Sequence, residues 1–178
     1  VVEKYTNNNL RPISIGIFGK YDNCDEAYIS LKEALLHAGI ANDSKEEIHW
    51  FKSEDLEKYK DNRGLNKFFE NLDGIIVPGG FDNRGIEGKI RCIQYAREKK
   101  VPFLGICLGL QCAVIEFSRN VCRLEGANSM EFDKETKNPV VKFVSGQDGL
   151  AKKSASMRLG AYDCELKKET IAYELYGQ

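Results

Sequence analysis

Apolar residues recur along the chain in two alternating patterns, compact runs of strand length and longer stretches with helical spacing. The predicted strands are Ile13–Phe18, Ile48–Phe51, Asp73–Pro78 and Val101–Ile106. Apolar positions three or four residues apart predict helices over Asp25–Ala38, Ser53–Tyr59, Ile86–Lys99 and Leu108–Ser118. Strands that alternate with helices predict an α/β fold, an open doubly wound and mostly parallel sheet with helices on both faces, as in flavodoxin-like proteins.

Local signals refine this outline at several points. We predict Gly39 as the C-cap of the first helix and Ser53 as the N-cap of the second. The continuous apolar run Val101–Ile106 predicts a strand that is buried on both faces. After Arg119 the pattern becomes irregular. It contains two strand-like pieces and, between them, a polar segment that we expect to be a mobile loop. These segments are Val140–Val144, Met157–Leu159 and Ser145–Ser156.

The sequence Gly105-Ile-Cys107-Leu-Gly109 marks the point where the fourth predicted strand passes into a helix. It is a Gly-x-Ser-x-Gly nucleophile elbow with sulfur in place of oxygen, in which the glycines permit a sharp turn and close packing. The N-terminal dipole of the following helix favours a thiolate at Cys107. A buried, inert cysteine is the alternative for any single cysteine.

Gly79-Gly80 follows the third predicted strand, so parallel pairing would bring it to the same sheet edge as Cys107. A glycine pair lets a backbone N–H approach a ligand closely. The Gly80 N–H and the Leu108 N–H, which follows the nucleophile, could together stabilise an oxyanion. An ordinary strand-ending turn is the alternative reading of the glycine pair.

Composition and charge narrow the classes of partner. The chain has 178 residues, is 42% hydrophobic and 30% charged, and is therefore globular rather than disordered. Its formal net charge of −1 gives no general attraction to nucleic acid or to a membrane, which favours a small-molecule substrate. Six cysteines without a Cys-x-x-Cys pair predict neither a disulfide framework nor a metal site, and fit a reducing cytoplasm.

Several motifs, taken together, resemble the class I glutamine amidotransferase domain of the CTP synthase family. They are Pro78-Gly-Gly-Phe81, Arg84-Gly-Ile-Glu-Gly88, Gly105-Ile-Cys-Leu-Gly-Leu-Gln111, Ala127-Asn-Ser-Met-Glu-Phe132 and Met157-Arg-Leu-Gly160. The resemblance implies that Cys107 attacks the side-chain amide of glutamine, forms a thioester and releases ammonia. It also implies that Gly80 and Leu108 line the oxyanion site.

The same resemblance implies a glutamine-binding set of Gly79, Gly80, Phe81, Leu108, Gly109, Leu110, Gln111 and Glu131. Within it, the Glu131 carboxylate could pair with the substrate α-ammonium group, and Gln111 could form a hydrogen bond near the sulfur. Without the resemblance, Glu131 would be read as a solvated carboxylate on a loop.

The resemblance further implies a regulated domain within a longer enzyme. Arg84, Gly85 and Glu87 match a loop through which GTP stimulates glutamine hydrolysis, although an exposed entry to a helix is the alternative. The domain itself would need no cofactor. ATP, Mg²⁺ and UTP would bind a separate synthase domain of the same polypeptide, which uses the ammonia, and the full protein would form homo-oligomers. We expect residues 1–11 to be an interdomain linker remnant and residues 12–178 the amidotransferase domain, with its C-terminal part missing.

Departures from the family pattern leave two other interpretations open. The His-x-Glu pair that supplies the family's general base is absent from the sequence, and His37 and His49 precede the elbow, so we interpret both as structural or surface residues. Asp82 replaces a usual glycine, and Met130 a usual threonine. The alternatives are another amidotransferase or hydrolase with a cysteine elbow, or a non-catalytic regulatory or assembly module.

Overall fold

The computed structural model describes residues 10–20, 28–59, 64–80, 83–143, 161 and 163–176. The chain divides into two compact units, residues 1–142 and residues 143–178. The first unit contains the sheet and the elements that surround Cys107. In the second, a short helix, α7 (Ile171–Leu175), begins after Thr170, whose hydroxyl accepts a hydrogen bond from the Tyr173 N–H at 3.3 Å.

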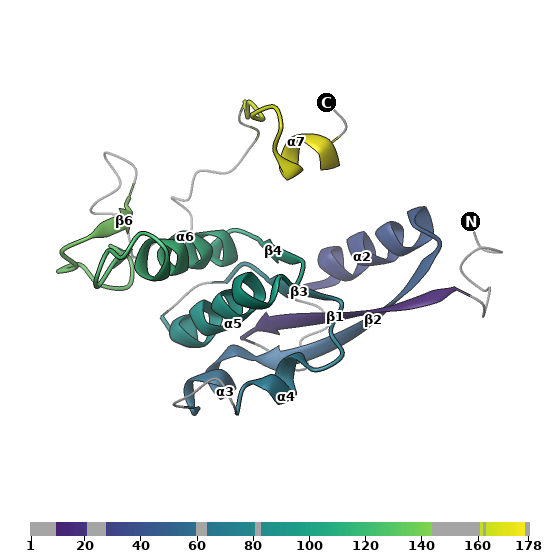
Figure 1. Cartoon of the computed structure of the whole chain (residues 1–178), viewed down its shortest axis with the longest axis horizontal. Coiled ribbons are helices and arrows are strands. Elements are labelled where there is room, and N and C mark those ends of the chain that lie inside the picture. The colour runs from purple at the N-terminus through teal and green to yellow at the C-terminus, as the bar shows by residue number, and fades with distance from the viewer. Residues whose placement is uncertain are drawn as a thin grey trace. The chain divides into compact units, whose positions relative to one another are not determined.

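The first unit is built on a four-stranded parallel sheet, as the alternation of strands and helices predicts (Figure 1). Its strands lie in the order β2-β1-β3-β4, and every pair is parallel. They span β1 (Arg11–Gly19), β2 (Ser44–Lys52), β3 (Gly74–Val77) and β4 (Phe103–Gly105). The two inner strands, β1 and β3, are paired on both sides, and this arrangement confirms the predicted fold class.

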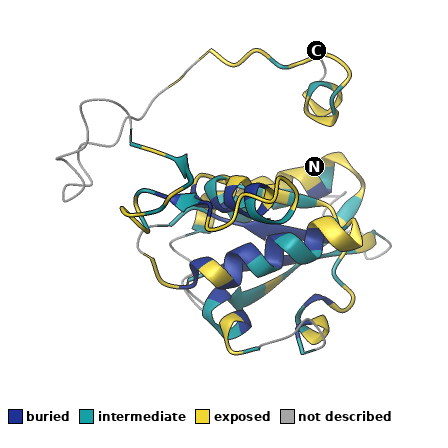
Figure 2. Cartoon of the chain, turned by 60° about the vertical axis from the view of Figure 1, so that its left-hand side comes forward, coloured by how far each residue is buried: buried dark blue, intermediate teal, exposed yellow. Residues whose placement is uncertain are grey.

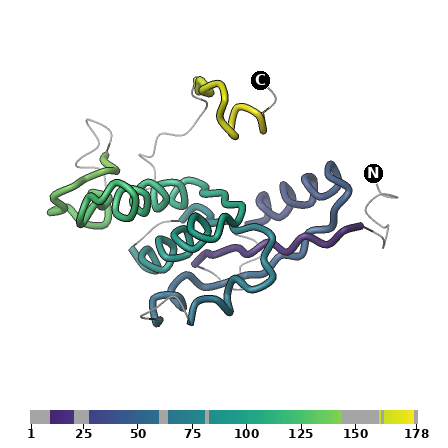
Figure 3. Tube along the Cα trace, in the orientation of Figure 1, coloured from purple at the N-terminus to yellow at the C-terminus, as the bar shows by residue number. Residues whose placement is uncertain are grey.

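Within the described residues, five helices connect the strands or follow them: α2 (Ile29–Ala41), α3 (Ser53–Glu57), α4 (Asn66–Phe69), α5 (Ile86–Lys99) and α6 (Leu108–Asn120). The tube in Figure 3 follows the path from β3 through α5 and β4 into α6. The prediction for α5 is confirmed at both ends, and α6 runs two residues beyond its predicted end. The four-residue α4 is too short to show a helical period in the sequence.

Both predicted helix caps are wrong. Gly39 lies inside α2, which continues to Ala41, and the Asn42 side chain donates a hydrogen bond to the Ala38 carbonyl at 2.8 Å just beyond the helix end. Ser53 is the first residue of α3 rather than its N-cap. Its buried hydroxyl donates to the Gly19 carbonyl at 3.0 Å, so it joins α3 to the end of β1.

The hydrophobic core joins the sheet to α3, α4, α5 and α6 (Figure 2). All four residues of β3 are buried. The α5 residues that face them repeat at helical spacing, as predicted for Ile86, Ile90, Ile93 and Ala96. Phe18 on β1 is fully buried and stacks on Phe51 with ring centroids 4.7 Å apart. The carboxyl ends of β1 and β3 are therefore fixed by packing.

Strand β4 differs from the prediction of a strand that is buried on both faces. In the described sheet it pairs only with β3, and Leu104 is 53% exposed. The apolar run correctly predicts a strand, but hydrophobicity alone does not reveal whether a second strand lies beside it.

The segment after α6 forms a small sheet of its own. Strands β5 (Asn128–Ser129) and β6 (Pro139–Val141) are parallel, and β6 corresponds to the strand predicted at Val140–Val144. The predicted strand Met157–Leu159 and the predicted loop Ser145–Ser156 lie outside the described residues. Among the helices that the structure describes, we find none with the length and apolar character needed to cross a membrane.

Candidate active site

Cys107 lies at a sharp turn between β4 and α6. It is exposed and takes the N-cap position of α6 with φ 52° and ψ −108°. A positive φ is unfavourable for a residue with a side chain, by about 1–3 kcal/mol, and persists only where the surrounding structure enforces it. Strain of this kind is concentrated at functional sites and directs the thiol away from the core.

The glycines on either side of Cys107 enforce this turn. A Cβ atom on Gly105 would lie 2.7 Å from the carbonyl carbon of Gly109, and one on Gly109 would lie 1.9 Å from the carbonyl oxygen of Val77. The Val77 oxygen also accepts a hydrogen bond from the Ile106 N–H at 3.0 Å. Only glycine at both positions lets the start of α6 pack this closely on the end of β3.

The Gly79-Gly80 loop leaves β3 beside the turn. A Cβ atom on Gly79 would lie 3.4 Å from the Cβ of Cys107, and one on Gly80 would lie 3.6 Å from Cδ2 of Leu108. The first N–H groups of an α-helix have no partner within the helix, and the Leu108 N–H is the first in α6. The structure therefore brings Gly79, Gly80, Cys107 and Leu108 together. Phe81 lies outside the described residues.

The first turn of α6 places two further predicted residues above the elbow. The Gln111 N–H donates to the Cys107 carbonyl at 3.1 Å, and the Gln111 side chain is half-buried. Leu110 is 58% exposed. Cys112 is fully buried, and burial raises the pKa of its thiol to about 12. An exposed thiol and an inert thiol thus lie five positions apart on consecutive turns.

Glu131 lies on the turn that follows β5, and its side chain is exposed. Its backbone N–H donates to the Ser129 hydroxyl at 3.2 Å, and the Ser129 carbonyl accepts from the N–H groups of Phe132 and Asp133. The buried Ser129 is therefore the centre of this turn and orients its backbone.

The residues of the predicted effector loop are held by ion pairs. Arg84 Nε lies 2.8 Å from a carboxylate oxygen of Glu54 on α3. Gly85 has φ 74° and takes the N-cap position of α5. Glu87 accepts from Nη1 of Arg119 with both carboxylate oxygens, at 2.9 and 3.0 Å. Sequence reasoning missed Glu54 and Arg119, because no local spacing signals a partner 30 or more residues away.

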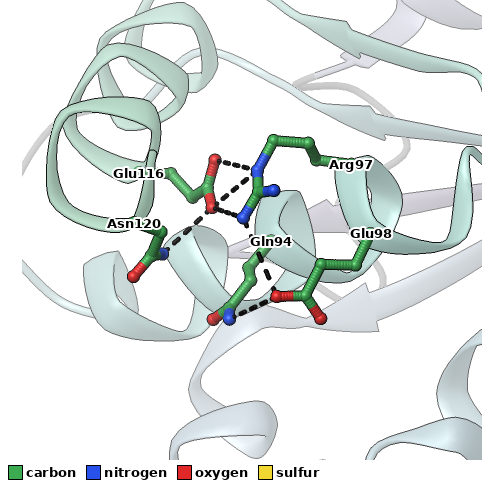
Figure 4. A network of polar contacts seen from close by, with 5 residues as sticks. All are labelled: Gln94, Arg97, Glu98, Glu116 and Asn120. Atoms are coloured by element: carbon green, nitrogen blue, oxygen red, sulfur yellow. Dashed lines mark hydrogen bonds and ion pairs between the residues drawn. The ribbon is translucent and has the colours of Figure 1, made fainter. Parts of the chain in front are cut away.

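A second ion pair between α5 and α6 was also missed. Arg97 donates to Glu116 from Nε at 3.1 Å and from Nη2 at 2.8 Å, and Asn120 donates to the same carboxylate at 3.0 Å (Figure 4). The Glu116 side chain is only 2% exposed. The hydrogen bond to this carboxylate raises the pKa of Arg97. The arrangement fixes the two helices together.

The two histidines lie on exposed positions of other elements, His37 on α2 and His49 on β2. Among the described residues, no group of three or more His, Cys, Asp or Glu side chains is arranged to hold a metal ion.

Comparison with known proteins identifies the family. Residues 24–170 match the family model described as glutamine amidotransferase class-I. The chain belongs to the class I glutamine amidotransferase family.

Similar proteins agree with this assignment. The chain is 55% identical over 173 residues to a CTP synthase of Methanocaldococcus jannaschii and 52% identical over 178 residues to one of Syntrophus aciditrophicus. These matches cover 96% and 100% of the chain but only 32% of either relative. The chain thus spans about a third of the length of the curated relatives that it matches.

A solved structure matches at the level of the fold. It is the glutaminase domain of a Trypanosoma brucei CTP synthase with bound acivicin, with 40% identity and a TM-score of 0.69, and the match covers 75% of this chain and 50% of that one. The resemblance predicted from the motifs is therefore confirmed for the family and for the fold.

Proposed function

We propose that this chain is the glutaminase domain of a CTP synthase and that Cys107 is its nucleophile. The observation that carries the proposal is the strained, exposed Cys107 at the start of α6, with the Gly79-Gly80 loop beside it. The family match and the acivicin-bound relative support the choice of glutamine as substrate, since acivicin is a glutamine analogue.

The proposed reaction is an acyl transfer through sulfur. The Cys107 thiolate attacks the side-chain amide carbon of glutamine, and the N–H groups of Gly80 and Leu108 stabilise the oxyanion that forms. The C–N bond then breaks, and the nitrogen takes a proton from water and leaves as ammonia. Water hydrolyses the thioester, which gives glutamate and regenerates the thiol. We assign neither His37 nor His49 as the general base.

Substrate binding in this proposal uses the remaining predicted residues. Glu131 pairs with the α-ammonium group of glutamine, and the first turn of α6, with Leu110 and Gln111, lines the pocket beside the sulfur. The segment Arg84–Glu87 receives the stimulatory signal of GTP. The strong sequence similarity to CTP synthases supports these assignments.

At the level of the whole enzyme, the ammonia serves a synthase domain of the same polypeptide. That domain binds ATP, Mg²⁺ and UTP and forms CTP, and the enzyme acts as a homo-oligomer in the cytoplasm. The chain spans only about a third of its CTP synthase relatives, which supports the presence of a further domain in the whole enzyme.

The test measures ammonia release from glutamine and covalent labelling by acivicin, located by mass spectrometry. We expect Cys107→Ala to abolish both. The matched control is Cys122→Ala, because Cys122 is also free and exposed and lies just beyond α6; it should leave both unchanged. Labelling at another cysteine, or ammonia release that survives Cys107→Ala, would overturn the role of Cys107. A folded chain that takes no label would favour the non-catalytic alternative.

A further inference from the structure

Arg119, near the C-terminal end of α6, makes two sets of hydrogen bonds with one guanidinium group. Nη1 donates to both carboxylate oxygens of Glu87 at 2.9 and 3.0 Å, while Nε donates to the backbone carbonyl of Ala127 at 2.6 Å. The Arg119 side chain is 22% exposed, and Ala127 is fully buried. A planar guanidinium with donors on different edges suits such a junction, whereas a lysine would offer only a point charge.

One end of this junction is a rigidly packed helix start. The Glu87 segment is fixed to α3, because a Cβ atom on Gly88 would lie 1.8 Å from the Ser53 carbonyl oxygen. The Gly88 N–H donates to the Glu57 carboxylate at 3.1 Å, which satisfies a donor in the first turn of α5. The backbone at Glu87 is therefore fixed by packing on α3, and its carboxylate is held where it can accept the hydrogen bonds from Arg119.

The other end of the junction is the segment that leads to Glu131. Ala127 precedes β5 by one residue and Ser129 by two. The Ser129 hydroxyl accepts the Glu131 N–H at 3.2 Å, and the Met130 N–H donates to the Val141 carbonyl at 3.0 Å. The hydrogen bond from Arg119 thus fixes the carbonyl four residues before the proposed ammonium-binding carboxylate.

We propose that Arg119 is a positioning residue for glutamine binding, which ties the Glu87 segment of α5 to the backbone that carries Glu131. The proposal rests on the proposed function. Arg119 does not touch the substrate; it sets the position of Glu131, so a change in the Glu87 segment alters the affinity for glutamine. This path joins the predicted effector loop to the glutamine site through one side chain.

The experiment compares wild type with Arg119→Gln, Arg119→Lys and Glu87→Gln in the full chain. The measured quantities are the kcat and KM of glutamine hydrolysis and the glutamine concentration that halves the rate of acivicin labelling at Cys107. We expect Arg119→Gln to raise KM roughly tenfold or more, because the Ala127 carbonyl loses a charged donor. The glutamine concentration that halves labelling, here called the protecting concentration, should rise by a similar factor. The kcat should change by less than about threefold. Arg119→Lys should recover part of the loss, since it keeps the charge opposite Glu87.

The matched control is Arg97→Gln, which removes the same charge and breaks the other ion pair between α5 and α6. The contacts of Arg97 are to Glu98 and Glu116, which are on those two helices. We expect this variant to lose thermal stability at least as much as Arg119→Gln and to keep the wild-type KM. A KM effect confined to Arg119 and Glu87 would therefore not be a consequence of lower stability.

Two results would overturn the proposal. One is an unchanged KM and protecting concentration in Arg119→Gln while wild type is labelled at Cys107. The other is an equal rise in Arg97→Gln. Failure of wild type to take label or release ammonia would instead refute the proposed function. Combining Glu87→Gln with Arg119→Gln completes the test: if the two residues act through one contact, the double variant should lose little more than Arg119→Gln alone.

Discussion

Substitution of Gly109 by alanine tests whether the close approach of α6 to β3 positions Cys107, the proposed nucleophile. The new Cβ atom would lie 1.9 Å from the Val77 carbonyl oxygen, whereas real contacts of this kind essentially never fall below 3.0 Å. The start of α6 must therefore move by about 1.1 Å relative to β3. That movement would displace the Leu108 N–H and the Cys107 thiol together.

The expected magnitudes follow from this displacement. Overpacking costs about 3 kcal/mol at the upper end, and the better helix propensity of alanine offsets about 1 kcal/mol. The net loss of about 2 kcal/mol predicts a fall in Tm of about 4–8 °C. Misplacement of reacting groups by about 1 Å lowers the rate on the order of a hundredfold. The variant should thus be folded at 25 °C but nearly inactive.

The assay is kcat at saturating glutamine, with Tm measured by circular dichroism on the same samples. Gly88→Ala is the matched control, because its Cβ would lie 1.8 Å from the Ser53 carbonyl oxygen, a similar clash in the first turn of a different helix. It should lower Tm by a similar amount and leave kcat within a few-fold of wild type. Wild-type kcat in Gly109→Ala, or an equal loss in Gly88→Ala, would refute the reasoning.

Three further predictions concern burial and charge. Lys89 is 2% exposed, and its Nζ has no hydrogen-bond partner among the described residues, so Lys89→Met should stabilise the fold by about 1–3 kcal/mol in thermal unfolding at pH 7. Burial lowers the pKa of Lys89 below 10.5, so below that pH the unfolded chain binds a proton more readily than the folded one. The stability gained by Lys89→Met should therefore shrink as pH rises toward 10.5. A gain that grows with pH would contradict this. Glu116 is almost fully buried, so Arg97→Gln should cost about 2 kcal/mol or more in denaturant unfolding, and a loss below about 0.5 kcal/mol would mean that Glu116 finds other partners. Iodoacetamide at pH 8 should modify Cys107 and Cys122 in the folded chain long before the buried Cys92 and Cys112, as peptide mapping would show; early modification of Cys112 would contradict the packing of α6.

The elements that could be predicted are those whose signal is local. The apolar run at β3 reflects a strand that is wholly buried, and the helical spacing at α5 reflects a helix that buries one face. The sequence alone therefore locates both elements closely. Cys107 was singled out because its two glycines encode a turn within five residues, and the structure shows the close contacts that require them.

The features that were missed depend on residues distant in sequence. Ser53 has the chemistry of an N-cap, but the Gly19 carbonyl, 34 positions earlier, takes its hydroxyl hydrogen bond instead. Arg84 pairs with Glu54 on α3, and Glu87 pairs with Arg119 on α6. The spacing of residues in the sequence does not predict such contacts. The exposure of Leu104 likewise depends on which strands flank β4, which is a property of the sheet rather than of the run.

The Val77 carbonyl oxygen is hydrogen-bonded to Ile106 and lies against Gly109, so residues on both sides of Cys107 are seated on β3. Strand β3 is wholly buried, while β4, which leads into the turn, has three residues and a half-exposed side chain. Because these contacts fix the turn to β3, thermal motion of the outer strand β4 should have little effect on the Cys107 sulfur. The position of the sulfur is set mainly by the buried strand β3. Amide exchange at Ile106 should accordingly be as slow as in the protein interior.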